Sequence, residues 1–394
     1  MDGVLAPPGG WPASSGADLI GHAKQDVPVS TLRVLVITPD FPPAPGGIQL
    51  LISRLIQHAE GWRPQVVAVH HPDAERHDHA VEFAVRRAGS GLPHRAAVAA
   101  LNAQALAIGL RERPDLVLSA HLVTAPSAAA LERLRGVPWL QYVYGMEIDA
   151  RARLARWALP RAPAVVAISR YTAGKARELG APVERVHVVP PAADRPLRPL
   201  LSAKFDRPTI VTVARLEDRY KGFDVMLRAL PLVRAEVPGT QWLVLGEGSL
   251  RPELEATARA WDISDAVHFL GRIDDAQRDD LLARSHVFAM PSRAGPGGGE
   301  GFGIVFLEAA LHGLPCVAGR AGGALDAVAD GESGLLVDPS DHLAVADALV
   351  ELLRDPARAA AMGEAAQRRA QTFTWKAMAA RIDAIARDAV ARAR

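Results

Sequence analysis

Short continuous runs of apolar residues alternate with amphipathic stretches along the first half of the chain. The first run, Leu32 to Thr38, ends at Pro39 and has the composition of a strand that is buried on both faces. A turn rich in proline and glycine follows at 42–47, and a helical pattern runs from Ile48 to Ala59. The alternation continues, with strands expected at 65–69, 115–119, 139–144, 164–168 and 186–189. This order predicts a doubly wound α/β sheet.

The same alternation restarts after a cluster of prolines at positions 190, 191, 196 and 199, which indicates an interdomain linker. Strands are expected at 209–213, 241–245, 266–270, 287–290, 315–318 and 334–337, and helices at 342–353, 357–372 and 375–394. We therefore predict two doubly wound α/β domains, 31–192 and 200–373, that face a central cleft. Ligands of open parallel sheets bind at the carboxyl ends of the strands.

Composition narrows the class of protein. The 394 residues suffice for two domains of ordinary size. The formal net charge of +1 gives no indication of a nucleic-acid partner. The single cysteine, Cys316, argues against an intramolecular disulfide and a cysteine-rich metal site, and it favours a cytoplasmic location. Residues 1–30 lack the apolar segment of a secretory signal and are predicted to be a disordered leader.

The most informative segment is the glycine-rich loop at 295–303, which lies between an expected strand and a helix expected from Ile304 to His312. Backbone N–H groups at a helix start have no intrahelical partner and carry the positive end of the helix dipole. Glycines allow a phosphate to approach such a backbone closely. The loop is therefore a candidate cradle for a diphosphate. Gly46 and Gly47, between the first strand and the first helix, are a second candidate.

Charged residues flank this cradle. Glu300 precedes the helix and Glu308 lies within it, about 12 Å away if the whole segment is helical. That span suits the two ends of one extended ligand, because a carboxylate accepts hydrogen bonds from neighbouring hydroxyls. Both residues are also compatible with ordinary helical acids. Arg215 and Lys221 follow an expected strand, and Lys221 is expected to start the next helix. Two cations at this position either suit a diphosphate and the charge that grows as it departs, or face solvent.

From Arg33 onward the chain resembles the retaining glycosyltransferases of family 4, which have the GT-B fold. The resemblance rests chiefly on Glu300-Gly301-Phe302-Gly303 followed by Glu308, two glutamates with seven residues between them. Supporting motifs are Pro45-Gly46-Gly47, Arg215 with Lys221-Gly222, Phe269-Leu270-Gly271-Arg272 and Gly322-Gly323. The resemblance implies two Rossmann-like domains, in which residues 31–192 bind the acceptor and residues 200–373 bind the nucleotide-sugar donor. It also implies a final helix, 374–394, that returns to the first domain.

The family motifs imply a role for each matching residue. Arg215 and Lys221 would hold the donor diphosphate and stabilise its charge, Glu300 would hydrogen-bond the donor sugar, and Glu308 would hold the ribose. Gly47 and the backbone of Phe302, Gly303 and Ile304 would also contact the donor, and the backbone near Arg272 and Ile273 would contact its base. Acceptor contacts would come from Gly46 and Glu147. The implied reaction uses no metal and no covalent intermediate, because the acceptor attacks from the leaving-group side and the departing phosphate oxygen takes its proton.

One position departs from the family pattern. Many relatives have His-Gly where this chain has Tyr144-Gly145, and a tyrosine donates a hydrogen bond to a sugar hydroxyl but is not cationic at neutral pH. Tyr144 is therefore a candidate catalytic residue of a hexosyltransferase. Its presence also leaves open a catalytically silent sugar-nucleotide binding protein. An NAD-linked enzyme is suggested only by Gly246-Glu247-Gly248, which lacks the third glycine of a dinucleotide loop.

The pattern is similar to that of mannosyltransferases acting on inositol lipids, which favours GDP-mannose over a UDP-sugar as the donor. The acceptor is expected to be a hydroxyl of a lipid, a glycan or a natural product. The segment 151–157 alternates arginines with Leu154 and Trp157, and either contacts the inner face of a membrane peripherally or forms an ordinary exposed helix. No cofactor and no metal are expected, because the spacing of the nearest cluster matches no ligand motif: His70, His71, Asp73, His77 and His79. The sequence does not indicate an oligomeric state.

Overall fold

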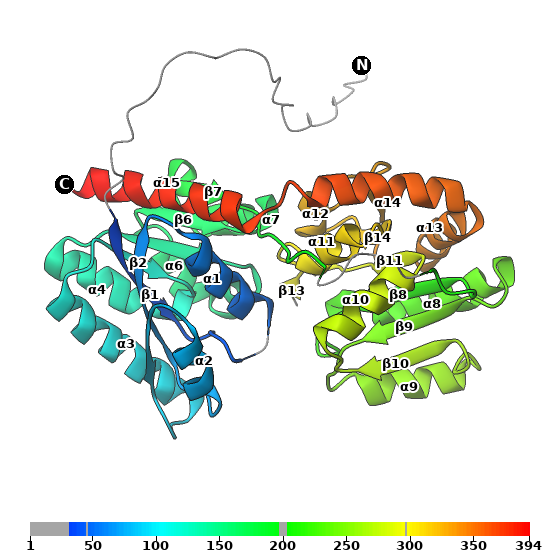
Figure 1. Cartoon of the computed structure of the whole chain (residues 1–394), viewed down its shortest axis with the longest axis horizontal. Coiled ribbons are helices and arrows are strands. Elements are labelled where there is room, and N and C mark those ends of the chain that lie inside the picture. Colours follow the sequence, from blue (N-terminus) through cyan, green and yellow to red (C-terminus); the bar gives the residue numbers. More distant parts are fainter. Residues whose placement is uncertain (1–30, 45, 197–202, 296–297) are drawn as a thin grey trace, which may run out of the picture. The chain divides into compact units, whose positions relative to one another are not determined.

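The apolar runs of the sequence form two parallel sheets. They are resolved in a computed structural model that describes residues 31–44, 46–196, 203–295 and 298–394. The expected leader at 1–30 lies outside the described residues, as do Pro45 of the first glycine turn and Pro199 of the proline-rich segment. Figure 1 labels many of the strands and helices of both sheets.

The first sheet has the strand order β3-β2-β1-β4-β5-β6-β7 within the described residues, and every pair is parallel. Its strands are β1 (Leu32–Thr38), β2 (Trp62–Val69), β3 (Ala84–Ala88), β4 (Leu116–Ser119), β5 (Trp139–Val143), β6 (Ala164–Ala167) and β7 (Val186–Val188). The helices between them are α1 (Gly47–His58), α2 (Ala74–Ala80), α3 (His94–Glu112), α4 (Ala125–Arg135), α5 (Met146–Ala150), α6 (Ala152–Ala158) and α7 (Arg170–Glu178), with short 3-10 turns η1 (Leu122–Thr124) and η2 (Val183–Arg185).

Both faces of this sheet are buried, which explains the continuous apolar runs. Val34 and Val36 of β1 face a core that contains residues of α1, whereas Leu35 and Ile37 face a core that contains residues of α3, α4, α6 and α7. The alternation along one strand thus places helices on both sides of the sheet.

The second sheet has the order β10-β9-β8-β11-β14-β15 in the described part of the chain, again all parallel. Its strands are β8 (Thr209–Val213), β9 (Gln241–Leu245), β10 (Val267–Gly271), β11 (Val287–Met290), β14 (Cys316–Gly319) and β15 (Gly334–Val337). Its helices are α8 (Phe223–Glu236), α9 (Arg251–Ala260), α10 (Asp275–Arg284), α11 (Ile304–Leu311), α12 (Ala324–Ala327), α13 (His342–Arg354) and α14 (Pro356–Ala370), with the 3-10 turn η3 (Arg219–Lys221).

The last helix, α15 (Trp375–Ala393), packs on α1, β5 and β6 of the first sheet (Figure 1). Asp194, which follows β7, fixes its start: Oδ1 accepts a hydrogen bond from the indole of Trp375 at 2.8 Å, and Oδ2 accepts one from Arg54 of α1 at 2.6 Å. One carboxylate therefore joins the segment that leaves the first sheet to the helix that returns to it.

Three local predictions were wrong or incomplete. Strand β3 was missed because its sequence, AVRRA, contains two arginines and lies at the sheet edge, where one face meets solvent. The glycine-rich loop contains a small antiparallel pair, β12 (Ala294–Gly295) and β13 (Gly298–Gly299). Lys221 does not start a helix; it ends η3, and α8 begins at Phe223 after Gly222 has adopted φ of +84°.

Each sheet reverses its winding direction at one point, between β1 and β4 in the first and between β8 and β11 in the second. Ligands of doubly wound sheets bind at such switch points, outside the carboxyl ends of the strands. The segments that follow these four strands supply most of the candidate residues.

Candidate active site

Lys221 and Glu300 form an ion pair at the carboxyl end of the second sheet. The Lys221 ammonium contacts Oε2 of Glu300, and each side chain is only 12% exposed. Burial lowers the pKa of Lys221, but the adjacent Glu300 carboxylate outweighs burial and holds that pKa above its usual value. The lysine is therefore fully charged at neutral pH, and the structure brings together two of the residues that the sequence selected.

Arg215 lies near this pair but points to a more open environment. Its guanidinium donates a hydrogen bond to Asp218 at 3.0 Å, and its side chain is 69% exposed. Asp218 also raises the pKa of Lys221, so the carboxylate acts on both cations. Tyr220 lies between these charges, since its ring is 5.1 Å from the Lys221 nitrogen, and burial raises its pKa to about 12. No sequence pattern had pointed to Tyr220.

The glycine-rich loop leads directly into the start of α11, as the sequence predicted. Gly303 has φ of +87°, a left-handed conformation that favours glycine, and the N–H groups at the start of α11 follow directly. The Phe302 side chain is buried and packs against Phe373. This contact anchors the loop to the core. Direct contacts of Phe302, Gly303 and Ile304 with a donor stay predictions.

Two glycines allow other backbone segments to approach Glu300 and Gly301. The N–H of Gly323 donates to the Glu300 carbonyl at 2.7 Å, and a Cβ on Gly323 would lie 2.1 Å from the Gly301 carbonyl. A Cβ on Gly301 would lie 2.1 Å from the carbonyl of Tyr144 in the first domain. Any larger residue at 301 or 323 would push the motif out of place. The sequence had marked Gly322-Gly323 only as part of a family pattern.

A pocket of about 410 Å³ separates the starts of α1 and α11. Gly47 begins α1, and a Cβ added to it would lie 3.8 Å from Cδ1 of Ile304 at the start of α11. Two helix N-termini therefore meet at one pocket, which is a favourable environment for a diphosphate. Its lining residues include Gly46, Gly47, Gln49, Arg278, Ile304, Val305 and Glu308.

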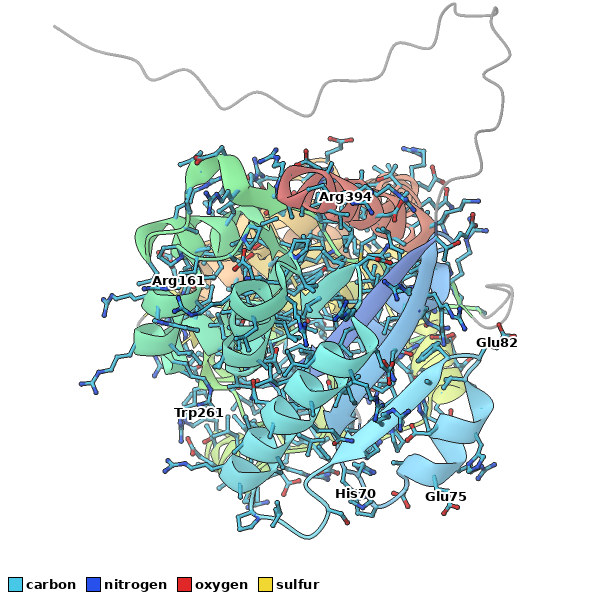
Figure 2. All side chains as sticks on the ribbon, turned by 90° about the vertical axis from the view of Figure 1, so that its left-hand side faces the viewer. His70, Glu75, Glu82, Arg161, Trp261 and Arg394 are labelled. Carbon is cyan, nitrogen blue, oxygen red and sulfur yellow. The ribbon has the colours of Figure 1, made fainter. Side chains whose placement is uncertain are left out.

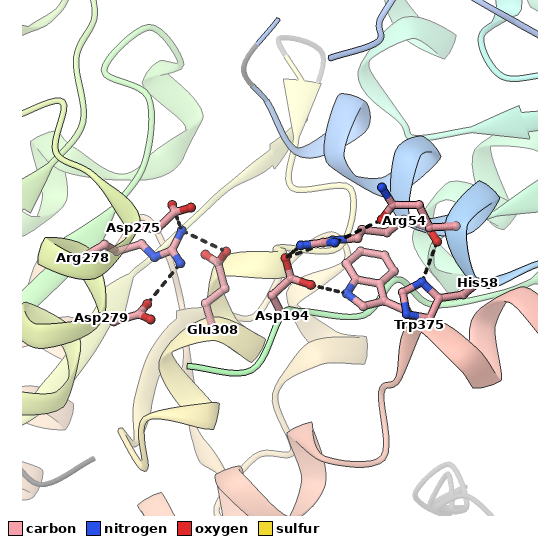
Figure 3. Close-up of polar contacts among 9 residues, drawn as sticks. Arg54, His58, Asp194, Asp275, Arg278, Asp279, Glu308 and Trp375 are labelled. Atoms are coloured by element: carbon pink, nitrogen blue, oxygen red, sulfur yellow. Dashed lines mark hydrogen bonds and ion pairs between the residues drawn. The ribbon is translucent and has the colours of Figure 1, made fainter. Parts of the chain in front are cut away.

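Glu308 lies at the other side of this pocket, facing Arg278 of α10 (Figure 3). The Arg278 guanidinium is 3.7 Å from Oε1 of Glu308 and donates to Asp275 at 2.9 Å and to Asp279 at 3.1 Å. Burial raises the pKa of Glu308, and the positive charge of Arg278 opposes that rise. Sequence spacing could not identify Arg278 as the partner, because it lies on a different element.

The predicted base-contacting segment follows β10. Arg272 is exposed, and Ile273 is half-buried against the core that contains α11. Their position next to α10 brings them to the side of the second sheet that holds Arg278 and Glu308. Contact with a base stays a prediction for both residues.

The side chains of Tyr144 and Glu147 make hydrogen bonds within the first domain. The Tyr144 hydroxyl donates to the carbonyl of Ala120 at 2.9 Å, and its ring stacks on Tyr142 with centroids 5.1 Å apart. Oε1 of Glu147 accepts the Tyr144 N–H at 2.6 Å, and burial raises the pKa of this carboxyl. Tyr144 thus holds the loop that touches Gly301, and its hydroxyl already has an acceptor. Roles in catalysis or acceptor binding remain predictions.

The residues that resembled a metal-binding cluster lie around α2, and Figure 2 shows His70 and Glu75 at the surface of that region. In the described ranges no group of three or more His, Cys, Asp or Glu residues is arranged to hold a metal ion. Cys316 is buried, and burial raises the pKa of its thiol. Gly246 and Gly248 pack against the backbone of Ala214 and Leu216, so they serve the packing of β9 on the segment after β8.

Comparisons with known proteins agree with this geometry. The model of Glycosyltransferase Family 4 matches residues 45–195, and that of Glycosyl transferases group 1 matches residues 198–369. A GDP-mannose-dependent alpha-(1-6)-phosphatidylinositol monomannoside mannosyltransferase of Mycobacterium tuberculosis is 33% identical over 367 residues, which cover 87% of this chain and 94% of that protein.

Two solved structures show the same fold. Sucrose-phosphate synthase from Thermosynechococcus elongatus has a TM-score of 0.77 at 21% identity, covering 92% of this chain and all of that one (100%). Anabaena HepE in complex with UDP-glucose has a TM-score of 0.73 at 20% identity, covering 89% of this chain and 98% of that one. At such identities the likeness concerns the fold alone.

Proposed function

Because this chain belongs to glycosyltransferase family 4 and is a hexosyltransferase that uses a nucleotide-sugar donor, we propose that it transfers mannose from GDP-mannose to a hydroxyl of an inositol-containing glycolipid. The observation that carries the proposal is the pocket between the starts of α1 and α11, with the Lys221–Glu300 pair beside it and Glu308 in its wall. The name of the Mycobacterium tuberculosis relative supplies the donor and the acceptor class.

In the proposed reaction the helix starts at Gly47 and Ile304 bind the diphosphate, and Lys221 and Arg215 neutralise it. Glu300 accepts a hydrogen bond from a hydroxyl of the donor sugar while its carboxylate stays next to the Lys221 ammonium. Glu308 accepts hydrogen bonds from the ribose while it stays next to Arg278. Both arrangements keep the buried charges paired, which avoids the cost of an isolated carboxylate. Positioning and electrostatic stabilisation of the leaving group then do the catalysis.

The bond changes follow from this placement. The acceptor oxygen attacks the anomeric carbon from the face that the diphosphate leaves, so the configuration at that carbon is retained. As the bond from carbon to the phosphate oxygen breaks, that oxygen takes the proton of the acceptor hydroxyl. The protein residues supply no covalent intermediate, and the proposed mechanism assigns the neutralising charge to Lys221 and Arg215 without a metal ion.

The direct test is transfer of labelled mannose from GDP-mannose to phosphatidylinositol monomannoside in vesicles, with UDP-glucose as the competing donor. We expect a mannosylated lipid, and a melting temperature that GDP raises more than UDP does, because a ligand that binds only the folded state stabilises it. Transfer from UDP-glucose alone would contradict the donor, and transfer only to a soluble glycan would contradict the acceptor. Binding of GDP without transfer to any acceptor would contradict the reaction itself.

A lipid acceptor requires access to a bilayer, and we propose that α6 provides it at the cytoplasmic face. No described helix is both long and apolar enough to cross a membrane. Trp157 is 37% exposed, Arg161 stacks over its ring at 5.5 Å, and Figure 2 shows Arg161 at the surface. An exposed tryptophan with neighbouring arginines suits anionic headgroups. Sedimentation with anionic vesicles is expected to fall in Trp157→Ala and to remain unchanged in Trp261→Ala, a matched exposed tryptophan on the other domain.

A further inference from the structure

Two polar side chains of the first domain lie at its switch point and take no part in the donor site. Asp40 follows β1 by two residues, and His121 follows β4 by two residues. The register places these strand ends side by side, because Ile37 pairs with Ser119, and Ser119 pairs with Gln141 of β5. Both side chains therefore lie at the edge of the sheet where ligands of this fold bind.

Tyr144 connects this edge to the donor loop. Its hydroxyl donates to the carbonyl of Ala120, the residue before His121, and its own carbonyl abuts Gly301. Tyr144 also interacts electrostatically with Asp40. His121 and Asp40 consequently lie beside Tyr144, a residue that reaches from the first sheet to the donor motif.

His121 presents a single, defined hydrogen-bond donor. Its Nδ1 accepts the N–H of Val123 at 3.1 Å, so the proton of the neutral ring is on Nε2. Burial, with the charges of Arg151 and His94, lowers the pKa of His121 to about 4, so the ring is neutral at physiological pH. Among the described residues Nε2 has no hydrogen-bond partner, and the His121 side chain is only partly buried.

Asp40 presents the complementary acceptor. Its Oδ1 accepts a hydrogen bond from Gln49, which lines the donor pocket, at 3.3 Å. Its Oδ2 has no hydrogen-bond partner within the part of the chain that the structure describes. Burial raises the pKa of Asp40, and His94 opposes that rise. One carboxylate oxygen is thus left for a ligand hydroxyl.

We propose that His121 and Asp40 form the subsite that orients the acceptor, with His121 Nε2–H donating to one acceptor hydroxyl and Asp40 Oδ2 accepting from a neighbouring one. This inference rests on the proposed function and assigns two residues to its acceptor side. A donor and an acceptor at the ends of two paired strands suit two hydroxyls of one cyclic polyol. Tyr144 cannot serve as the outward donor because its hydroxyl is bonded to Ala120.

The test uses two replacements of His121 that separate its structural contact from its outward donor. In His121→Asn, Oδ1 can still accept the Val123 N–H, but the outward donor is lost. In His121→Gln, the side-chain N–H₂ can reach the position of Nε2, but the contact with Val123 is lost. Asp40→Asn removes the acceptor at constant volume, and His79→Asn on α2 is the matched control. Binding of myo-inositol 1-phosphate in the presence of GDP is measured by calorimetry, alongside the melting temperature and slow hydrolysis of the donor.

We expect His121→Asn and Asp40→Asn to bind the inositol phosphate about tenfold more weakly at an unchanged melting temperature and donor hydrolysis, the loss of one hydrogen bond. His121→Gln should bind within about threefold of the native protein but melt lower. Equal binding by His121→Asn and the native protein, or no binding by the native protein, would overturn the subsite. Failure of transfer from GDP-mannose, with this binding pattern intact, would instead overturn the donor assignment.

Discussion

Replacement of Lys221 by alanine tests the central electrostatic claim. Lys221 is 12% exposed, so its field is only partly screened by water. Two unit charges 4 Å apart interact by about 4 kcal/mol at the effective dielectric constant of about 20 that suits such sites. If about half a unit of charge develops on the leaving phosphate, loss of the ammonium raises the barrier by roughly 2 kcal/mol. We expect kcat to fall by about 30-fold.

The assay is mannosyl transfer with both substrates saturating, because the charge grows between the bound state and the transition state and therefore affects kcat. Lys221→Ala also leaves Glu300 without its partner, which destabilises the fold by itself. The double variant Lys221→Ala/Glu300→Gln removes that buried charge and controls for stability. Lys376→Ala, an exposed lysine of α15, controls for a general loss of charge.

Two results would refute the reasoning. A kcat for Lys221→Ala within threefold of the native value would show that the lysine does not neutralise the leaving group. Recovery of kcat in the double variant would show that the defect of the single variant came from an unpaired glutamate. In either case the positive charge would have to come from Arg215 or from the helix starts.

Three further outcomes follow from the same site. Glu308→Gln should raise the donor KM by about tenfold with a smaller change in kcat, because the carboxylate is predicted to bind the ribose equally in the ground state and the transition state. Initial rates measure both constants, and an unchanged KM would contradict the ribose contact. Gly47→Ala should leave the melting temperature unchanged, because the new Cβ would lie at an ordinary 3.8 Å from Cδ1 of Ile304. The methyl group should nevertheless weaken GDP binding, because it occupies space that the diphosphate is proposed to use. Unchanged GDP binding in calorimetry would contradict the proposed contact between Gly47 and the diphosphate. The pKa of His121 is about 4 in the folded protein and about 6.5 in the unfolded chain, so between these pH values only the unfolded chain binds the extra proton. The contribution of His121 to stability is therefore complete above pH 6.5 and is lost as the pH falls towards 4, by up to about 1.4 kcal/mol per pH unit. The free energy of urea unfolding, measured at pH 5 and pH 7, should depend less on pH in His121→Asn than in the native protein, and an identical dependence would contradict this expectation.

The sequence predicted those parts of the fold that depend on local pattern. Continuous apolar runs identified most strands because both faces of a parallel sheet are buried, and β3 was missed because two arginines interrupt its apolar pattern at the sheet edge. The glycine-rich loop and the cation after β8 were found from residue type, since few residues other than glycine allow such close backbone approach. Lys221 and Glu300 are neighbours in the structure, although the pattern did not predict their ion pair.

Contacts between distant segments could not be predicted in the same way. Nothing near Gly301 in the sequence shows that its missing Cβ makes room for the carbonyl of Tyr144, and nothing near Glu308 identifies Arg278 as its partner. The position of Tyr144 suggested a sugar contact, but the three-dimensional neighbourhood supplies Ala120 as the acceptor of its hydroxyl. These contacts depend on the tertiary structure, which the type of a single residue constrains only weakly.

The joint at Asp194 has a consequence for biosynthesis. The first sheet is complete in sequence by residue 188, but the core beside α1 includes residues of α15, which begins at residue 375. A ribosome must make the whole second domain before the first can complete that core. Packing of the first domain should therefore be completed only after the second domain has been made, when Trp375 reaches Asp194.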